Sequence, residues 1–299
     1  SAGTGCRAAT SAAGVAAGVA AQATVTVTPL VLAGDFYGGT TVSPGFASVS
    51  RLEVNSSGQW LIFSTLAGSI DVLMTGQGTT LPATIIAMDG DPVTSGGNLS
   101  FFGRLSINSA GNNSFYATYT NAGTADSGIH YNTTSQVIVE QSVTTAPQLT
   151  AGTLYIGFFG GILNDDNQVL VMSSVDDVAI TSSVDRALVL VDNPGGVPTQ
   201  SVLMKEGDEV VPGRFLVDFQ TNPHTWSFAA GGRALVTPDM DGDTTNDTGL
   251  LYYNGSAWSF VAREGDACPA VAGRNWGNFG SANASDINNG GQWAARATL

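Results

Sequence analysis

A short turn motif recurs five times along the chain and constrains the fold more than any other feature of the sequence. An apolar residue, an asparagine, two small residues and a glycine precede an apolar run, most clearly at Val54–Phe63. Looser copies occur at Ile107–Gly111, Leu163–Val171, Phe228–Val236 and Ile287–Ala295. Asparagine in such a turn can bond its own backbone, and glycine accepts a positive φ. The motif therefore predicts five hairpin turns, and the competing interpretation is that the asparagines line a site.

Two copies of the motif depart from the pattern. Asn167 stands in place of glycine in the third copy, and asparagine is the next most tolerant residue at a positive φ. In the fourth copy, Phe228 occupies the place of the asparagine. That turn must therefore be closed by other groups.

A second element ends an apolar run with a Gly-Asp pair or its equivalent. It occurs at residues 34–35, 90–91, 141–142, 207–208 and 265–266. The two elements alternate along the chain, and successive copies of each element are roughly 50 to 65 residues apart. Such a period is typical of all-β arrays with about four strands per repeat. The chain starts with the back half of a repeat and stops with the front half. We therefore predict a five-bladed β-propeller with four-stranded blades, its terminal strands sharing the closing blade; an open stack of blades is the alternative.

The sequence divides into an N-terminal arm, residues 1–22, and a repeat domain, residues 23–299. The arm consists almost entirely of small residues and carries one charge, Arg7. It is either a flexible tail or a segment that lies on a neighbouring subunit, where a strand edge accepts an added strand. The second interpretation predicts a homo-oligomer or fibre formed through the arm.

The charge balance excludes some classes of partner. The chain has 10 Lys and Arg against 24 Asp and Glu, a formal net charge of −14. Such a surface disfavours nucleic acid and anionic membranes. No apolar run reaches the ~20 residues that span a bilayer, so membrane insertion is not expected. Glycans remain a candidate partner.

The cysteines and the sequons acquire a role only in an exported protein. Cys6 and Cys268 are either a disulfide across the closure of the ring or two unrelated thiols. Asn-x-Ser/Thr triplets, which a glycosylating host would modify, occur at Asn55, Asn98, Asn112, Asn132, Asn246, Asn254 and Asn283.

An acidic loop is the strongest motif for binding chemistry. Carboxylates and one amide gather there at Asp239, Asp241, Asp243, Asn246 and Asp247. Alternating oxygen ligands around a glycine suit Ca²⁺, although the EF-hand pattern is not met. The sequence thus predicts a calcium site, with a solvated acidic turn as the alternative.

No catalytic motif is present, so no catalytic residue is assigned. His130 and His224 are expected at the surface. Glu140, Glu206 and Glu264 share one repeat position and are interpreted as scaffold, which leaves Glu53, Glu209 and the aspartates for a carboxylate pair on the propeller axis.

The tryptophans indicate both core and ligand contacts. Trp60 and Trp293 share one repeat position and are expected in the core. Trp276, flanked by polar residues, is the candidate platform for stacking on a sugar.

The turn Asp286–Ala294, together with the strand end Phe260–Asp266, resembles the tandem NxxGxxAF repeats of bacterial "choice-of-anchor" surface proteins. The resemblance covers about residues 30 to 299. It implies an exported protein, often retained at the cell surface, and transfers no catalytic residue. We expect a structural or adhesive protein of the cell exterior, such as a surface-layer or fibre subunit. A carbohydrate-binding surface module is the alternative, and a propeller glycosidase ranks below it.

Overall fold

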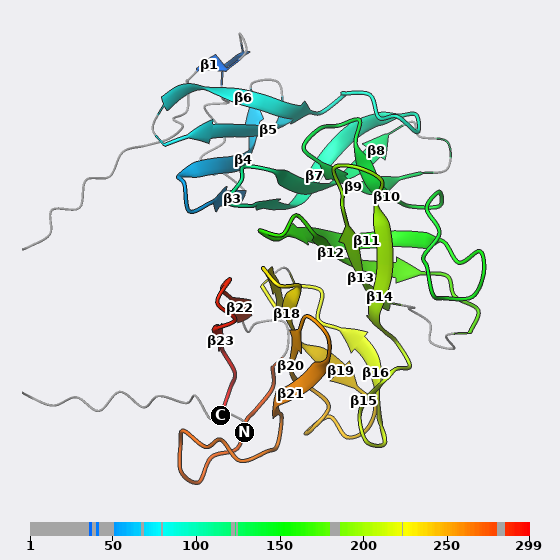
Figure 1. Cartoon of the computed structure of the whole chain (residues 1–299), viewed down its shortest axis with the longest axis vertical. Coiled ribbons are helices and arrows are strands. Elements are labelled where there is room, and N and C mark those ends of the chain that lie inside the picture. Colours follow the sequence, from blue (N-terminus) through cyan, green and yellow to red (C-terminus); the bar gives the residue numbers. More distant parts are fainter. Residues whose placement is uncertain are drawn as a thin grey trace, which may run out of the picture.

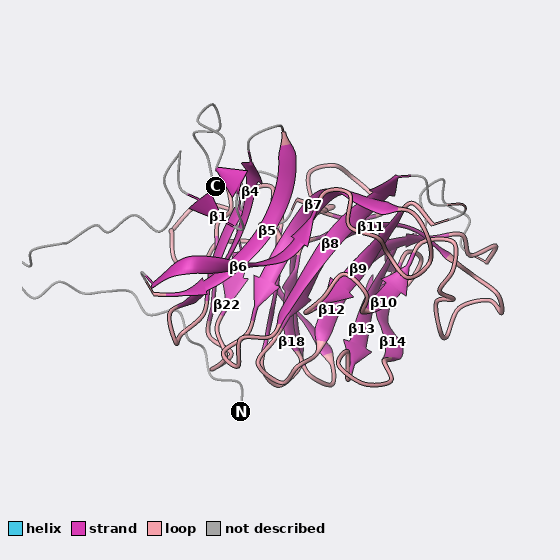
Figure 2. Ribbon diagram, turned by 90° about the horizontal axis from the view of Figure 1, so that it is seen from above, coloured by secondary structure: helices cyan, strands magenta, loops and turns pink. Residues whose placement is uncertain are grey.

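The computed structural model of the chain describes residues 36–37, 40–41, 51–66, 69–78, 80–120, 123, 125–179, 186–222, 224–279 and 285–299. All regular secondary structure in these residues is β-strand, which confirms the predicted all-β class (Figure 2). Across the same residues, no helix has the length and hydrophobicity of a membrane span. The predicted arm at residues 1–22 and the strand expected from Ala23 lie outside the described residues.

Four antiparallel sheets of four strands each follow one another along the chain (Figure 1). The first contains β3 (Arg51–Val54), β4 (Gln59–Leu66), β5 (Ile70–Gln77) and β6 (Thr80–Met88). The second contains β7 (Asn98–Ile107), β8 (Asn113–Thr120), β9 (Ser127–Tyr131) and β10 (Val137–Glu140). The third contains β11 (Tyr155–Leu163), β12 (Val169–Val175), β13 (Arg186–Asp192) and β14 (Thr199–Lys205). The fourth contains β17 (Trp226–Ala229), β18 (Arg233–Val236), β20 (Gly249–Asn254) and β21 (Trp258–Arg263).

Three smaller sheets complete the described structure. A three-stranded sheet contains β15 (Glu209–Val211), β16 (Arg214–Phe219) and β19 (Pro238–Met240). In the chain, β15 and β16 precede the fourth sheet, and β19 lies between its strands β18 and β20. One hairpin near the start pairs β1 (Phe36–Tyr37) with β2 (Thr40–Thr41). Another near the end pairs β22 (Ser285–Ile287) with β23 (Trp293–Ala295).

The turn motif joins the first strand of each repeat to the second. Gly58, Gly111 and Gly291 have φ of 79°, 86° and 77°, and Asn167 has 62°. The hairpin interpretation is therefore confirmed, because the glycine position of the motif, the fourth residue of the turn, adopts the left-handed conformation in each of these copies. The fourth copy needs a correction: Ala229 pairs with Arg233, as Asn55 faces Gln59, so Ala229 rather than Phe228 takes the asparagine position.

The Gly-Asp element links each sheet to the next. The N–H of Gly90 donates to the oxygen of Leu99, and the N–H of Gly207 donates to that of Leu216. In the second sheet, Ser142, with a φ of 57°, makes the equivalent bond to Tyr155. The equivalent of Glu206 is therefore Gln141, and the assignment of Glu140 to that position was wrong by one residue.

The first strands of successive repeats lie next to one another. β3 contacts β7, β7 contacts β11, β11 contacts β17, and β17 contacts β22. The hydrophobic core lies between neighbouring sheets, as in other stacked-sheet folds. Between the first two sheets, for example, the rings of Phe63 and Phe102 lie 5.9 Å apart. This packing places the first strands of the five repeats in one series, β3, β7, β11, β17 and β22.

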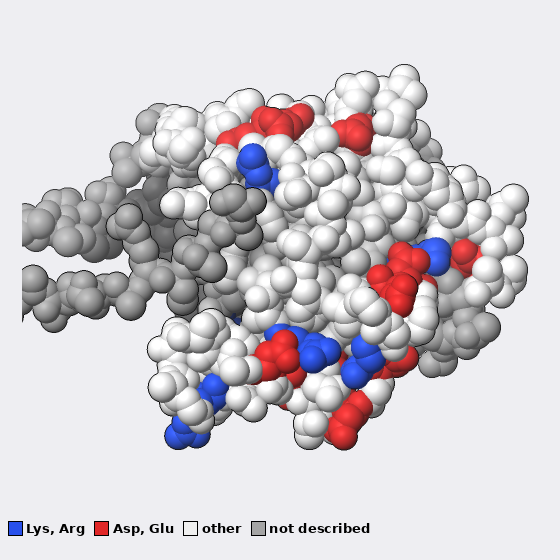
Figure 3. All heavy atoms as spheres, turned by 60° about the horizontal axis from the view of Figure 1, so that its bottom comes forward, with Lys and Arg blue, Asp and Glu red and all other residues white. Residues whose placement is uncertain are grey.

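The surface is poor in charge. Only 11% of the residues are charged. On the face in Figure 3, acidic and basic groups lie close together in a few places, and uncharged residues cover most of the rest.

Candidate functional site

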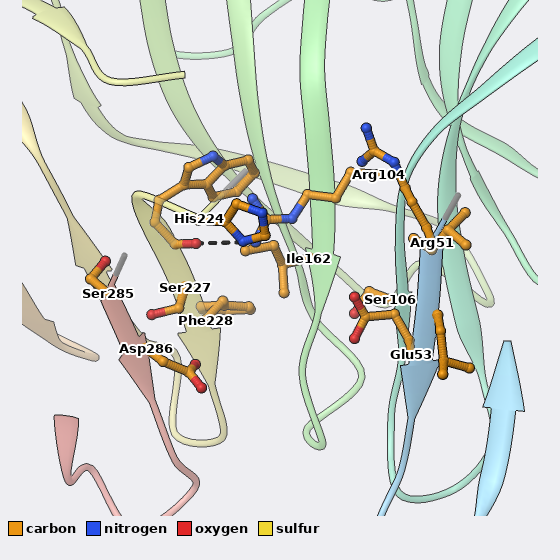
Figure 4. Close-up of a pocket in the computed structure, with 13 residues that line it drawn as sticks. Arg51, Glu53, Arg104, Ser106, Ile162, His224, Ser227, Phe228, Ser285 and Asp286 are labelled. Atoms are coloured by element: carbon orange, nitrogen blue, oxygen red, sulfur yellow. Dashed lines mark hydrogen bonds between the residues drawn. The ribbon is translucent and has the colours of Figure 1, made fainter. Parts of the chain in front are cut away.

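A cavity of about 650 Å³ lies where the first strands of the repeats meet. Its walls come from β3, β7, β11, β17 and β22, so every repeat contributes at least one residue (Figure 4). The volume falls within the roughly 300–1,000 Å³ of small-molecule sites. We call it the axial pocket.

One sequence position supplies the pocket in all five repeats. In each repeat the residue two places before the turn asparagine, or before Ala229 in the fourth copy, lines the cavity. These residues are Glu53, Ser106, Ile162, Ser227 and Asp286. Side chains alternate between the two faces of a strand, so this position faces inward whenever the turn has the same geometry. The same repeated segment of sequence therefore forms both the turn and one part of the pocket wall.

Arg104 crosses the pocket from β7 to β17 (Figure 4). Its guanidinium carbon lies 4.1 Å from the ring centroid of Trp226, and its Nη2 donates to the Trp226 oxygen at 3.1 Å. Room for its aliphatic stem comes from Gly160 on β11, where a Cβ would lie 2.7 Å from the Arg104 Cβ. Gly160 has a φ of 133°, which a side chain rarely allows. The fold thus holds this arginine from three sides.

The Arg104 guanidinium lies in protein rather than in water. Burial lowers the pKa of Arg104 to about 9, and the carboxylate of Glu53 opposes that effect. No carboxylate of the described residues lies within 4.0 Å of its nitrogens, and its Nη1 is buried without a hydrogen-bond partner. At neutral pH Arg104 is therefore still a cation, without a contact ion pair.

Two carboxylates face each other across the pocket, Glu53 on β3 and Asp286 on β22 (Figure 4). The surrounding protein raises the pKa of Glu53 through burial, and Asp286 adds to the increase. Arg104 and Arg51 oppose it. Glu53 nevertheless keeps contact with solvent inside the pocket, so it remains available to a ligand.

Several polar atoms of the pocket walls are buried and lack a hydrogen-bond partner. Besides Arg104 Nη1, they are the Ser227 Oγ, the Ser285 Oγ and the Trp226 Nε1. Buried polar groups are normally hydrogen-bonded, and each exception costs about 1–3 kcal/mol. These atoms lie beneath the surface of the cavity, so a ligand would reach the two serine hydroxyls only after their side chains turn.

A second cavity, of about 210 Å³, lies at the asparagine turns. The turns that line it are joined by side-chain bonds. Nδ2 of Asn55 donates to the Asn108 oxygen at 2.8 Å, Nδ2 of Asn108 to the Asn164 oxygen at 3.2 Å, and Nδ2 of Asn164 to the Ala229 oxygen at 3.0 Å. We call this chain of bonds the asparagine ladder. The asparagines therefore close turns, as one interpretation predicted, and they also line a cavity; that they line a ligand site stays a prediction.

The ladder changes at the fourth turn, where Ala229 has no side-chain amide. Arg233 takes over, and its Nη1 donates to the Ala230 oxygen at 2.8 Å and the Asn289 oxygen at 3.1 Å. At the fifth turn, Nδ2 of Asn288 bonds Gln292 within its own turn at 3.0 Å. Among the described residues, the ladder therefore runs from the first repeat to the fifth.

The predicted calcium loop is held by an arginine. Arg214 donates from Nη1 to the Asn246 Oδ1 at 3.0 Å, and its Nε lies 3.4 Å from the Asp241 Oδ1. The Asp243 Oδ1 accepts from the backbone and the hydroxyl of Thr245, each at 3.0 Å. Within the described residues, no group of three or more His, Cys, Asp or Glu is arranged to hold a metal. Calcium at Asp239–Asp247 stays a prediction.

The other predicted sites are scattered. Cys268 is buried as a free thiol, and Cys6 lies outside the described residues, so their pairing is untested. Asn254 is exposed, unlike the five other sequon asparagines that the structure describes, and Asn283 lies outside the described residues. Trp276 is half-buried against Phe279, with ring centroids 5.7 Å apart, and lines neither cavity.

The remaining candidate residues differ in burial and in location. Trp60 is core as predicted, at 1% exposed, whereas Trp293 is 45% exposed. His130, expected at the surface, is buried instead, and its Nε2 lies 2.9 Å from the Tyr119 hydroxyl. Glu209 lies in the peripheral strand β15, where it accepts from Gly213. Of the two glutamates left for an axial site, only Glu53 is there.

Sequence reasoning did not single out Arg104, Trp226 or Asp286. The signal that could have found Asp286 is its position two residues before the turn asparagine. Arg104 and Trp226 carry no such mark, because their contact joins repeats that are 122 residues apart.

Comparison with known proteins gives a family but no activity. No curated protein matches the chain significantly. A family model described as a family of unknown function, DUF7453, matches residues 13–256. That span includes the first three four-stranded sheets, the fourth sheet up to β20 and most of the axial pocket. The chain therefore belongs to the family of unknown function DUF7453.

Proposed function

We propose that this protein is an exported, adhesive protein of the cell exterior that binds carbohydrate in its axial pocket. The observation that carries the proposal is the cavity itself, to which all five repeats contribute and in which the carboxylates of Glu53 and Asp286 are exposed on opposite walls. Hydroxyl-rich ligands supply both donors and acceptors, so they can donate to the two carboxylates.

The proposal includes a five-bladed propeller as the architecture. Its support is the fivefold recurrence of one inward-facing position and the row of neighbouring first strands. Propellers place the first strand of each blade around an axis, where ligands bind. The hydrogen bonds of the asparagine ladder then join successive blades.

The closing blade is the incomplete part of this architecture. The hairpin β22–β23 has two described strands, whereas the preceding repeats each have four. Trp293 on β23 is 45% exposed, although its equivalent Trp60 is 1% exposed. We propose that residues 24–33, of which residues 24–28 alternate with the period of a strand, pair with β23 and cover Trp293. These residues lie outside the described part of the chain.

A glycosidase is the second candidate, and one observation favours it. Glu53, with a raised pKa, faces Asp286 across the pocket, as an acid and its partner carboxylate do in such enzymes. Release of reducing sugar from the oligosaccharides that bind would distinguish turnover from binding alone.

A glycan array probed with the full chain tests the proposed function, and calorimetry on each hit measures affinity. The Asp286→Asn change removes an acceptor from the pocket at constant shape, and we expect it to weaken binding about tenfold, since bonds to charged groups are worth roughly 1.5–3 kcal/mol. The matched control is Glu209→Gln, which alters a carboxylate on the peripheral strand β15. An array without hits, or equal affinities for both variants, would reject the pocket as the site.

A further inference from the structure

The axial pocket holds a buried cation that has no contact ion pair. Three other arginines also bury a guanidinium nitrogen that has no hydrogen bond: Arg186, Arg214 and Arg263. Each of them has an aspartate nearby, at 2.6, 3.4 and 3.1 Å respectively. Arg104 alone in this group has no carboxylate of the described residues within 4.0 Å, and Glu53 acts on it only from a longer distance. Buried charges in proteins are normally in contact with a partner, so Arg104 is the group in this pocket whose contact partner a ligand would supply.

We infer that the carbohydrate bound in the axial pocket is acidic, and that its carboxylate pairs with Arg104. The inference rests on the proposed function and adds the chemical class of the ligand. A guanidinium binds a carboxylate through two parallel N–H···O bonds, which makes arginine the usual residue for this recognition. Hydroxyls of the same sugar would then meet the carboxylates of Glu53 and Asp286 on the two side walls.

The fold fixes the Arg104 side chain before any ligand arrives. The Trp226 ring lies on one face of the guanidinium, and the Trp226 backbone oxygen holds Nη2. The Cα of Gly160 leaves space for the stem. A side chain held in this way loses little conformational entropy on binding, and its charge is not free to turn toward solvent. That is the arrangement expected of a recognition group rather than of a solvated surface arginine.

The charge of the whole chain makes the position of Arg104 significant. The protein carries −14, so an acidic ligand is repelled by most of the surface. Two of its 10 basic residues, Arg51 and Arg104, line the axial pocket. Glu53 and Asp286 in the same lining equal them in number, so the pocket is neutral overall and repels an acidic sugar less than the rest of the chain does.

Calorimetry with two probes of equal length tests the inference: an oligosaccharide of glucuronate and one of glucose. For the full chain we expect the acidic probe to bind at least tenfold more tightly. The Arg104→Gln change should remove this preference while the neutral probe loses less than threefold, and Arg104→Lys should keep part of it because the charge remains without the fork. Arg263→Gln, which alters a surface arginine paired with Asp266, is the control and should change neither affinity.

The outcomes separate the two proposals. Tight binding of the neutral probe with no preference for the acidic one would overturn the acidic ligand and leave the carbohydrate site standing. A preference that persists in Arg104→Gln would overturn the role of Arg104. Binding of neither probe, nor of any array glycan, would reject the carbohydrate site itself. Thermal denaturation of each variant shows whether it is folded, and Arg104→Lys tests the charge if Arg104→Gln does not fold.

Discussion

The side-chain amide of Asn55 donates a hydrogen bond of 2.8 Å to the backbone oxygen of Asn108, which lies 53 residues later in the next repeat. The same amide group also accepts the N–H of Gln59 in its own turn at 2.9 Å. One side chain thus closes a hairpin and fastens it to its neighbour. Because the bond is repeated at Asn108 and Asn164, the turn motif specifies contacts between sheets as well as local structure.

The first prediction concerns this ladder. The Asn108→Asp change keeps the oxygen that caps the turn and replaces the donor with an acceptor, which then faces the Asn164 oxygen in a buried position. We expect a loss of about 2–3 kcal/mol in the free energy of unfolding, measured by urea denaturation. The matched control is Asn288→Asp, because Nδ2 of Asn288 bonds only its own turn. Equal losses in both variants would show that the ladder adds nothing beyond the turns.

The second prediction is a pH dependence that His130 causes. Burial lowers the pKa of His130 to about 4, below the ordinary 6.5 of the unfolded chain. Between these values the unfolded chain binds a proton that the folded protein does not, so stability must fall as the pH drops from 6.5 to 4. The contribution is up to about 3 kcal/mol.

The difference between wild type and variant isolates this effect from the carboxylates. His130→Gln keeps a partner for the Tyr119 hydroxyl and removes the titration. We expect the variant to show a smaller loss of stability between pH 6.5 and 4 than the wild type, measured by denaturation at each pH. His224→Gln, on an exposed residue, should leave the profile unchanged. The prediction is wrong if the His130 variant keeps the full slope.

The third prediction tests calcium at residues 239–247. The Arg214 guanidinium lies against this loop, so a bound calcium ion would experience its positive charge. We expect Arg214→Gln to bind calcium more tightly than the wild type, with a larger fall in melting temperature on adding EDTA. If neither protein responds to EDTA and calorimetry with calcium gives no heat, the loop is an acidic turn held by Arg214 alone.

The fourth prediction concerns residues 24–33. If they complete the closing blade, deletion of residues 1–34 should destabilise the protein by about 2 kcal/mol or more, because Trp293 then stays exposed. Deletion of residues 1–22 should leave stability unchanged and abolish any oligomer, as measured by light scattering. Oligomers that survive the shorter deletion would exclude the arm as the contact. Equal stability of the two truncated proteins would exclude the strand.

The fifth prediction is a bond between Cys6 and Cys268. Peptide mapping under non-reducing conditions should find the two joined within one chain, and reduction should lower the melting temperature, since a disulfide that closes a long loop contributes roughly 2–5 kcal/mol. A joined pair that appears only in dimers would place the bond between subunits. Two free thiols would end the proposal.

The sequence by itself determined the strands, the turns and their number. Asparagine and glycine at fixed spacing require particular backbone angles, and Asn167 shows that the rule holds even after substitution. These are local preferences of a few residues, so they can be read without a structure. The same reasoning was wrong by one residue at Ala229 and at Gln141, where the register depends on the partner strand.

Only the tertiary structure decided where the chemistry lies. Arg104 meets Trp226 and Gly160 because β7, β11 and β17 line one cavity, and no local sequence pattern indicates that contact. Trp60 and Trp293 occupy the same place in the repeat, yet one is buried and the other exposed, because burial depends on which strands cover the sheet. Turn geometry is fixed by the energy of a few neighbouring residues. Burial and charge pairing depend on residues far apart in the chain, which only the packed sheets bring together.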